Sequence, residues 1–364
     1  MEPVIMNGHR VRLRGTTRHQ QGSALILVLW VLGLLSMLVA SFAFEAHIEL
    51  RLTSFYRDRT KAEYLARSGL DIAELLVAKS AQMQGAERDE AKAGSDIWYD
   101  PALQLAKGGT VSLVHDLAEA GVGQGLIRLS ITPEPARRNI NQLIDQTLAS
   151  DETWERIFDV GGIPQEMWPT LIDSFYDWTD QDSAPRPDGA ETDDYYANLE
   201  KPYRARNGPL DTVGELALIK GFSKDILEGG TLSTGMFESD TVVMSGISDM
   251  LTTYGDGKVN INAASARVLR TLPDVDEEMA ATIVSERETW VDATGAERRG
   301  FSSTGELVAL VPDFPPQAVD LLTTTSTEFR ITSTGDLNGV LRTIWCIVRF
   351  SGGQFTVLRW REDD

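Results

Sequence analysis

The stretch "SALILVLWVLGLLSMLVASFAF", Ser23–Phe44, is 22 residues long and carries no charge. At about 1.5 Å per residue, a helix of this length reaches roughly 33 Å, and the hydrocarbon core of a bilayer is about 30 Å thick. The stretch is apolar on every face, which is typical of a membrane span and not of a core helix in a soluble domain. A cleaved signal peptide is the alternative, since Ser41-Phe42-Ala43 suits a signal peptidase, but its apolar region usually runs only about 7–15 residues. We therefore expect a single-pass membrane helix over residues 23–44.

The flanking charges predict the orientation of this helix. Residues 1–22 hold four arginines against Glu2, a net charge of +3, and basic segments stay on the cytoplasmic side. The bulk of the chain then lies in the periplasm. The whole chain carries −20, so residues 23–364 carry −20 − 3 = −23. So acidic a surface argues against nucleic acid as a partner. Cys346 is the only cysteine, which excludes an intrachain disulfide.

The helical pattern continues beyond the apolar stretch. No proline occurs between Ser23 and Lys79, and apolar or small residues recur every three or four positions from Ile48 to Leu76. This spacing predicts one long helix with a periplasmic half that packs on a domain. Two helices with a bend near Glu45 are the alternative.

The basic leader, the glycine at its end and the apolar helix opening "SALILVLW" resemble a type IV pilin-like N-terminus. The resemblance implies that a prepilin peptidase cleaves between Gly22 and Ser23 and that Ser23 is N-methylated. The fifth mature residue is usually a glutamate that pairs with a neighbour's terminal amine, but here it is Leu27. The absence of this glutamate and the large size resemble the protein K family, the minor pseudopilins of the type II secretion system.

That resemblance implies a location and a set of partners. The chain is expected in the inner membrane, at the tip of the pseudopilus, where it serves pseudopilus assembly and the export of folded proteins. Its expected partners are the other minor pseudopilins, the major pseudopilin, the prepilin peptidase and the inner-membrane assembly platform.

Alternating patterns predict an antiparallel sheet. Gly109–Leu117 and Gly125–Glu134 alternate as strands do, and Glu328–Trp360 offers three more strands separated by hairpin turns. We expect an α+β fold in which the long N-terminal helix packs on this sheet and a large α-helical domain is inserted into it. The expected segments are a leader (1–22), a transmembrane half-helix (23–44), a periplasmic half-helix (45–80), the first part of the pilin-like domain (81–137), the insert (138–326) and the C-terminal strands (327–364).

The insert contains a weak repeat that resembles paired helix-hairpin-helix units. One copy begins at Asn207 and the other at Val259, with Asp211 and Asn262 as expected helix N-caps. Asn139-Ile140-Asn141 also echoes Asn260-Ile261-Asn262. A membrane-anchored DNA-uptake protein is therefore the alternative function. Its phosphate-binding turn would, however, read "LPDVDEE", which is acidic where phosphate contacts require N–H groups and cations.

The most concentrated group of carboxylates lies between Asp177 and Asp194, seven in 18 residues with Arg186 as the only base. Such a loop relieves its repulsion by extending into solvent or by binding a cation. Calcium prefers six to eight oxygen ligands, whereas zinc would want cysteine or histidine. A solvated acidic loop is the alternative, and the resemblance to protein K favours calcium. The candidate ligands are Asp177, Asp180, Asp182, Glu191 and Asp194.

Catalysis is not expected. The four histidines are scattered, two of them in the leader, and the sequence contains no Gly-x-Ser-x-Gly, His-Glu-x-x-His or P-loop motif. A glycosidase-like carboxylate pair is conceivable within the acidic loop, but nothing in the sequence specifies the separation that such a pair needs.

Overall fold

The structure is a computed structural model, and it describes residues 21–86, 89–233, 241–288 and 300–363. Residues 1–20, which make up most of the expected leader, lie outside this range. The chain divides into two compact units. The first ends at Asp58 and the second runs from Arg59 to the C-terminus.

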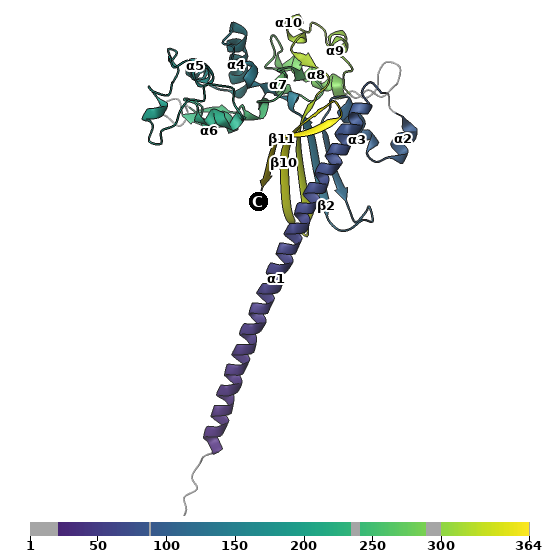
Figure 1. Cartoon of the computed structure of the whole chain (residues 1–364), viewed down its shortest axis with the longest axis vertical. Coiled ribbons are helices and arrows are strands. Elements are labelled where there is room, and N and C mark those ends of the chain that lie inside the picture. The colour runs from purple at the N-terminus through teal and green to yellow at the C-terminus, as the bar shows by residue number, and fades with distance from the viewer. Residues whose placement is uncertain (1–20, 87–88, 234–240, 289–299, 364) are drawn as a thin grey trace, which may run out of the picture. The chain divides into compact units, whose positions relative to one another are not determined.

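A single helix, α1 (Gln21–Gln82), includes Glu45, where a bend was the alternative (Figure 1). Over Ala24–Gln82 it contains a window with mean hydropathy 2.6, so by length and composition it could cross a membrane. Its large apolar side chains from Leu25 to Phe44 are exposed, as lipid-facing side chains would be. The apolar pattern and the lack of proline together account for the unbroken helix.

The second unit contains a five-stranded antiparallel sheet in the order β1-β2-β9-β10-β11. Its strands are β1 (Val111–Asp116), β2 (Leu126–Pro133), β9 (Glu328–Leu337), β10 (Val340–Ser351) and β11 (Gln354–Asp363). The turn from β9 to β10 places Asn338 and Gly339 at positive φ, a backbone that asparagine and glycine adopt readily. Two short helices, α2 (Glu90–Ser95) and α3 (Tyr99–Ala106), precede β1. The predicted α+β fold is confirmed.

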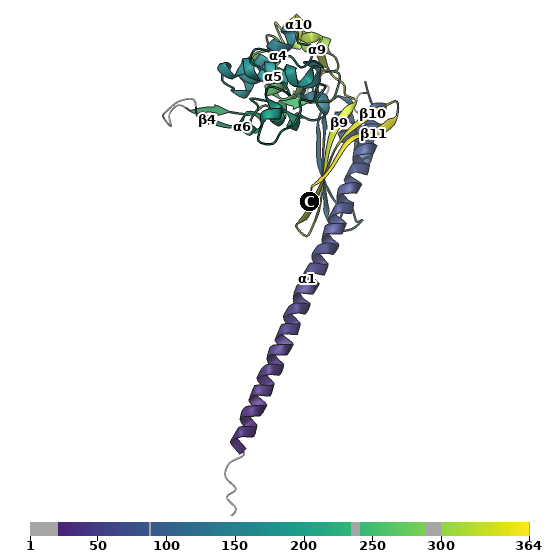
Figure 2. The same cartoon turned by 60° about the vertical axis from the view of Figure 1, so that its left-hand side comes forward.

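The part of α1 that follows Arg59 packs on this sheet (Figures 1 and 2). Ala73, Leu76 and Val77 form an apolar core with residues from β1, β2, β9 and β10. Helix and sheet approach closely at Gly335. A Cβ atom there would lie 2.0 Å from the carbonyl oxygen of Ala62. Glycine at this position therefore sets how closely the helix can lie against the sheet.

The chain between β2 and β9 forms the insert, with a separate apolar core. In Figure 1, α4, α5 and α6 form one group, and α8, α9 and α10 form another. The α-helices of the insert are α4 (Leu148–Gly161), α5 (Trp168–Thr179), α6 (Lys224–Glu228), α7 (Ala266–Leu269), α8 (Glu277–Glu288), α9 (Thr304–Leu310) and α10 (Pro316–Val319). Its strands are β3 (Arg138–Asn139), β4 (Gly230–Ser233), β5 (Thr241–Met244), β6 (Leu251–Thr252), β7 (Val259–Asn260) and β8 (Leu322–Thr323). Its 3₁₀ turns are η1 (Glu134–Ala136), η2 (Ile140–Gln142), η3 (Gln165–Met167), η4 (Tyr196–Asn198), η5 (Val213–Leu218) and η6 (Ser248–Met250).

The insert is built from two similar halves. The first half (138–252) runs from β3 to β6, and the second half (259–323) runs from β7 to β8. In each, the first and last strands pair in parallel. The sequence Asn-Ile-Asn begins at Asn139, the last residue of β3, and again at Asn260, the last residue of β7. The second asparagine of each copy makes an equivalent hydrogen bond. Oδ1 of Asn141 accepts from the main-chain N–H of Leu210 at 2.8 Å, and Oδ1 of Asn262 accepts from that of Phe301 at 2.7 Å. The two halves therefore align with Asn139 on Asn260.

This alignment corrects the predicted repeat, which paired Asn207 with Val259. The expected N-caps were also wrong. Thr212 precedes η5, and Ser265 caps α7 through a hydrogen bond from the N–H of Val268. Asn262 cannot cap a helix because its side chain holds Phe301, 39 residues further along the chain. A local sequence pattern could not reveal that bond.

Candidate functional site

The acidic segment follows α5 directly. The helix ends at Thr179, and Asp180 is its C-cap in an extended conformation, so the chain turns away from the helix at this point. The segment then returns toward α5, and Asp180, Asp182 and Glu191 each place one carboxylate oxygen within 4.8 Å of the other two. Three of the five predicted ligands therefore converge.

Two of these carboxylates have a buried oxygen with no hydrogen-bond partner. Glu191 is only 1% exposed, and neither its Oε1 nor Oδ1 of Asp180 meets a donor among the described residues. Burial, together with neighbouring carboxylates, raises the pKa of Glu191 to about 7 and also raises the pKa of Asp180. Burying carboxylates side by side is unfavourable unless a cation lies between them.

The other two predicted ligands make hydrogen bonds within the protein. Oδ2 of Asp177 accepts from the main-chain N–H of Arg186 at 3.1 Å, and burial raises the pKa of Asp177 to about 6. A Cβ atom on Gly189 would lie 1.9 Å from this oxygen, so the loop can approach only because residue 189 is glycine. Asp194 accepts from the N–H of Glu191 at 2.8 Å. Both residues thus shape the loop that carries the three converging carboxylates.

Asn207 is a further candidate ligand, which was not among the five predicted from the sequence. Its main-chain N–H donates to the carbonyl oxygen of Trp178 at 2.9 Å, and its Nδ2 donates to that of Asp182 at 3.1 Å. Asn207 therefore bridges the segment that carries Asp180 and Asp182, and its own Oδ1 is buried without a partner among the described residues. The only signal in the sequence was Asn207-Gly208, a turn pattern that suits the positive φ found at Asn207.

Lys220 also contacts the acidic segment. Its Nζ donates to the carbonyl oxygen of Gly189 at 2.8 Å and lies over the ring of Tyr195. The ammonium group thus binds the acidic loop, which does not favour the DNA-uptake alternative, since that function needs cations for phosphate contacts. With carboxylate and amide oxygens as the donor set, the residues present fit a hard cation such as calcium.

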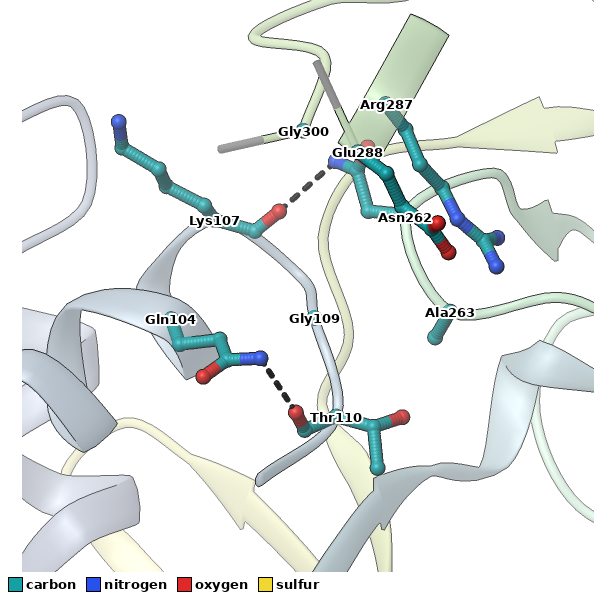
Figure 3. Close-up of a pocket in the computed structure, with 9 residues that line it drawn as sticks. All are labelled: Gln104, Lys107, Gly109, Thr110, Asn262, Ala263, Arg287, Glu288 and Gly300. Carbon is teal, nitrogen blue, oxygen red and sulfur yellow. Dashed lines mark hydrogen bonds between the residues drawn. The ribbon is translucent and has the colours of Figure 1, made fainter. Parts of the chain in front are cut away.

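A polar cavity lies between the first part of the pilin-like domain and the second half of the insert (Figure 3). It measures about 230 Å³. Nδ2 of Asn262 donates across it to the carbonyl oxygen of Lys107 at 2.7 Å, and Gln104 donates to that of Thr110 at 2.7 Å (Figure 3). The first of these bonds links the insert to the chain that leads into β1, which makes this a structural junction.

The residues expected to act in processing and assembly lie near the start of α1. Gly22 and Ser23 fall in its first turn, and Leu27 is 65% exposed.

Comparison with known proteins agrees with this architecture. A family model described as "Type II secretion system (T2SS), protein K" matches residues 136–229, which contain the acidic segment. The chain is 28% identical over 214 residues to a putative type II secretion system protein K from Escherichia coli K12, covering 57% of this chain and 60% of that relative. It is 25% identical over 290 residues to type II secretion system protein K from Pseudomonas aeruginosa, covering 79% and 75%.

The fold also resembles a solved structure. A chain from the GspK-GspI-GspJ complex of enterotoxigenic E. coli superposes with a TM-score of 0.56 at 15% identity, covering 87% of this chain and 99% of that one. At this identity the likeness establishes the fold alone. The family model and the two relatives show that this chain is similar to protein K of type II secretion systems.

Proposed function

We propose that this protein is a minor pseudopilin at the tip of the type II secretion pseudopilus, where it supports pseudopilus assembly and the export of folded proteins. The observation that carries this proposal is the insertion of a whole domain between two neighbouring strands, β2 and β9, of a pilin-like sheet. A subunit with so large an addition would obstruct another subunit above it in a fibre. Leu27 supports the same position, because it cannot supply the charge that pairs with a neighbour's amine.

The remaining assignments follow from that role. The apolar half of α1 anchors the chain in the inner membrane with its N-terminus in the cytoplasm, and the sheet and insert lie in the periplasm. Prepilin peptidase cuts between Gly22 and Ser23, and Ser23 is then methylated. The proposed partners are the other minor pseudopilins, the major pseudopilin and the assembly platform. The neighbouring solved structure, a complex with GspI and GspJ, supports the first of these.

Quantitative mass spectrometry of isolated pseudopili tests the tip position. We expect about one copy of this chain per pseudopilus, cross-linked to smaller minor pseudopilins. Copies in numbers close to those of the major subunit, spread along the fibre, would exclude the tip role.

The acidic segment has a structural role in this proposal. Calcium held by Asp180, Asp182, Glu191 and Asn207, with Asp177 and Asp194 supporting the loop, offsets the repulsion among carboxylates in the folded insert. A ligand at 100 times its dissociation constant stabilises the folded state by about 2.7 kcal/mol. For a domain of this size, that corresponds to a rise in melting temperature of roughly 5–11 °C.

Differential scanning calorimetry of the whole chain in detergent measures this rise in calcium against chelator. Glu191→Gln should abolish it, because it removes the most deeply buried carboxylate of the cluster. The matched control is Asp188→Asn, which removes an exposed carboxylate from the same loop and should keep the full rise. Equal melting temperatures with and without calcium would favour the solvated acidic loop.

A further inference from the structure

Arg138 is a buried cation at the start of the first half of the insert. It lies on β3, paired with Leu251 of β6, and only 5% of the residue is exposed. Nη1 of its guanidinium group is buried, so this end of the side chain lies inside the protein.

The second half of the insert has an apolar residue at the equivalent position. The alignment of Asn139 with Asn260 places Arg138 on Val259, which is 0% exposed and also lies on a strand of a parallel pair. The same local architecture thus forms with an ordinary apolar side chain. An arginine is not required to build it, and burying one is unfavourable.

Among the described residues, no acidic group compensates this charge. Nη1 of Arg138 is buried without a hydrogen-bond partner, and no ion pair joins Arg138 to a carboxylate in the described part of the chain. The charged group that acts on it is another cation, Arg156 of α4. Burial and the charge of Arg156 together lower the pKa of Arg138 to about 10, so the side chain is still protonated at neutral pH.

Arg156 lies where the two halves of the insert meet. Its Nε donates to the carbonyl oxygen of Thr271, in the second half, at 3.3 Å. Its Nη1 lies 3.6 Å from Oε2 of Glu152, one helical turn earlier. Glu152 thus balances one of the two guanidinium charges, and one positive charge is left over.

We propose that the first half of the insert binds a monovalent anion of about the size of chloride, held by Arg138 with support from Arg156. The single uncompensated charge calls for a monovalent ion, and a small ion is easier to bury beside a side chain that is 5% exposed than a large one. A bound anion supplies the acceptor that Nη1 lacks and cancels the repulsion between the two arginines. It would stabilise the contact between α4 and the second half. This site is separate from the acidic segment and does not depend on the proposed secretion role.

The test uses the whole chain in detergent, kept in chelator so that calcium plays no part. Sodium chloride replaces sodium gluconate at constant ionic strength, and thermal unfolding is followed. Chloride at about ten times its dissociation constant should raise the melting temperature by roughly 3–6 °C. Inorganic phosphate at the same ionic strength should give a much smaller rise, because it is larger and, near neutral pH, partly divalent.

Three variants assign the effect to the site. Arg138→Met keeps most of the side-chain length without the charge, and its melting temperature should no longer respond to chloride. Arg138→Lys should respond with weaker affinity. Arg204→Met, which removes an exposed arginine from the same half, should respond like the wild type.

Chloride-35 nuclear magnetic resonance gives a direct measurement that does not require any variant to fold. The wild-type protein should broaden the chloride line in a saturable manner. Absence of both broadening and the chloride-dependent rise in the wild type would overturn the proposal. So would a folded Arg138→Met variant that keeps the full chloride response.

Discussion

Replacing Gly335 by alanine should loosen α1 from the sheet. The added Cβ would lie 2.0 Å from the carbonyl oxygen of Ala62, 2.7 Å from the main-chain nitrogen of Ala66 and 2.7 Å from Cβ of Leu65. Ordinary contact begins near 3.4 Å, so the helix backbone must retreat by about 3.4 − 2.0 = 1.4 Å. Gly335 lies in a regular strand, so alanine itself meets no backbone strain there.

The retreat costs stability because it opens the core around Ala73, Leu76 and Val77. A gap of about 1 Å already forfeits up to half of the dispersion energy of the atoms that line it. Overpacking of this kind costs about 1–3 kcal/mol, which changes the equilibrium for local opening by roughly 5- to 150-fold.

Amide hydrogen exchange of the whole chain in detergent measures that opening strand by strand. Peptides from β9 and β10 should exchange roughly 5- to 150-fold faster in Gly335→Ala, whereas peptides from α4 and α5 should keep their rates and serve as an internal control. Gly208→Ala is the matched variant, because nothing lies within 4 Å of the added atom. Unchanged exchange in β9 and β10, or an equal increase in Gly208→Ala, would refute the reasoning.

Three further results are expected. Mass spectrometry of the membrane-extracted protein should find a mature chain that begins with methylated Ser23; a terminus at Phe44 or Glu45 would contradict membrane anchoring. Leu27→Glu should melt at the same temperature as the wild type, since Leu27 is exposed and outside both apolar cores; a lower melting temperature would show that the leucine supports the fold. In chelator, the stability of the insert should fall as pH rises from about 4.5 to about 7, because the raised pKa of Glu191 leaves a proton on the folded state that the unfolded state has lost. Glu191→Gln should show less of this decline and saturating calcium should remove it, so a wild-type stability that rises through the same range in chelator would contradict the proposed environment of Glu191.

Much of the fold follows from local patterns in the sequence. The apolar stretch, the helical spacing up to Leu76 and the alternation in five strands each depend on neighbours within a few residues, so they can be recognised without the structure. The turn from β9 to β10 is specified in the same way by Asn338 and Gly339. The concentration of carboxylates after Asp177 was visible because charge can be read from composition alone.

Only the tertiary structure decided which polar groups meet and which are buried. Five carboxylates were candidate ligands, and folding brings three of them together, while Asn207 joins the segment through bonds to Trp178 and Asp182. The true register of the repeat rests on bonds from Asn141 to Leu210 and from Asn262 to Phe301. From the sequence alone, Arg138 would be expected on the surface, as most arginines are. In the structure it lies on β3, which pairs with β6, and it is only 5% exposed. Local periodicity specifies the elements, but desolvation and the convergence of side chains arise from contacts between residues far apart in the chain, and these depend on the completed fold.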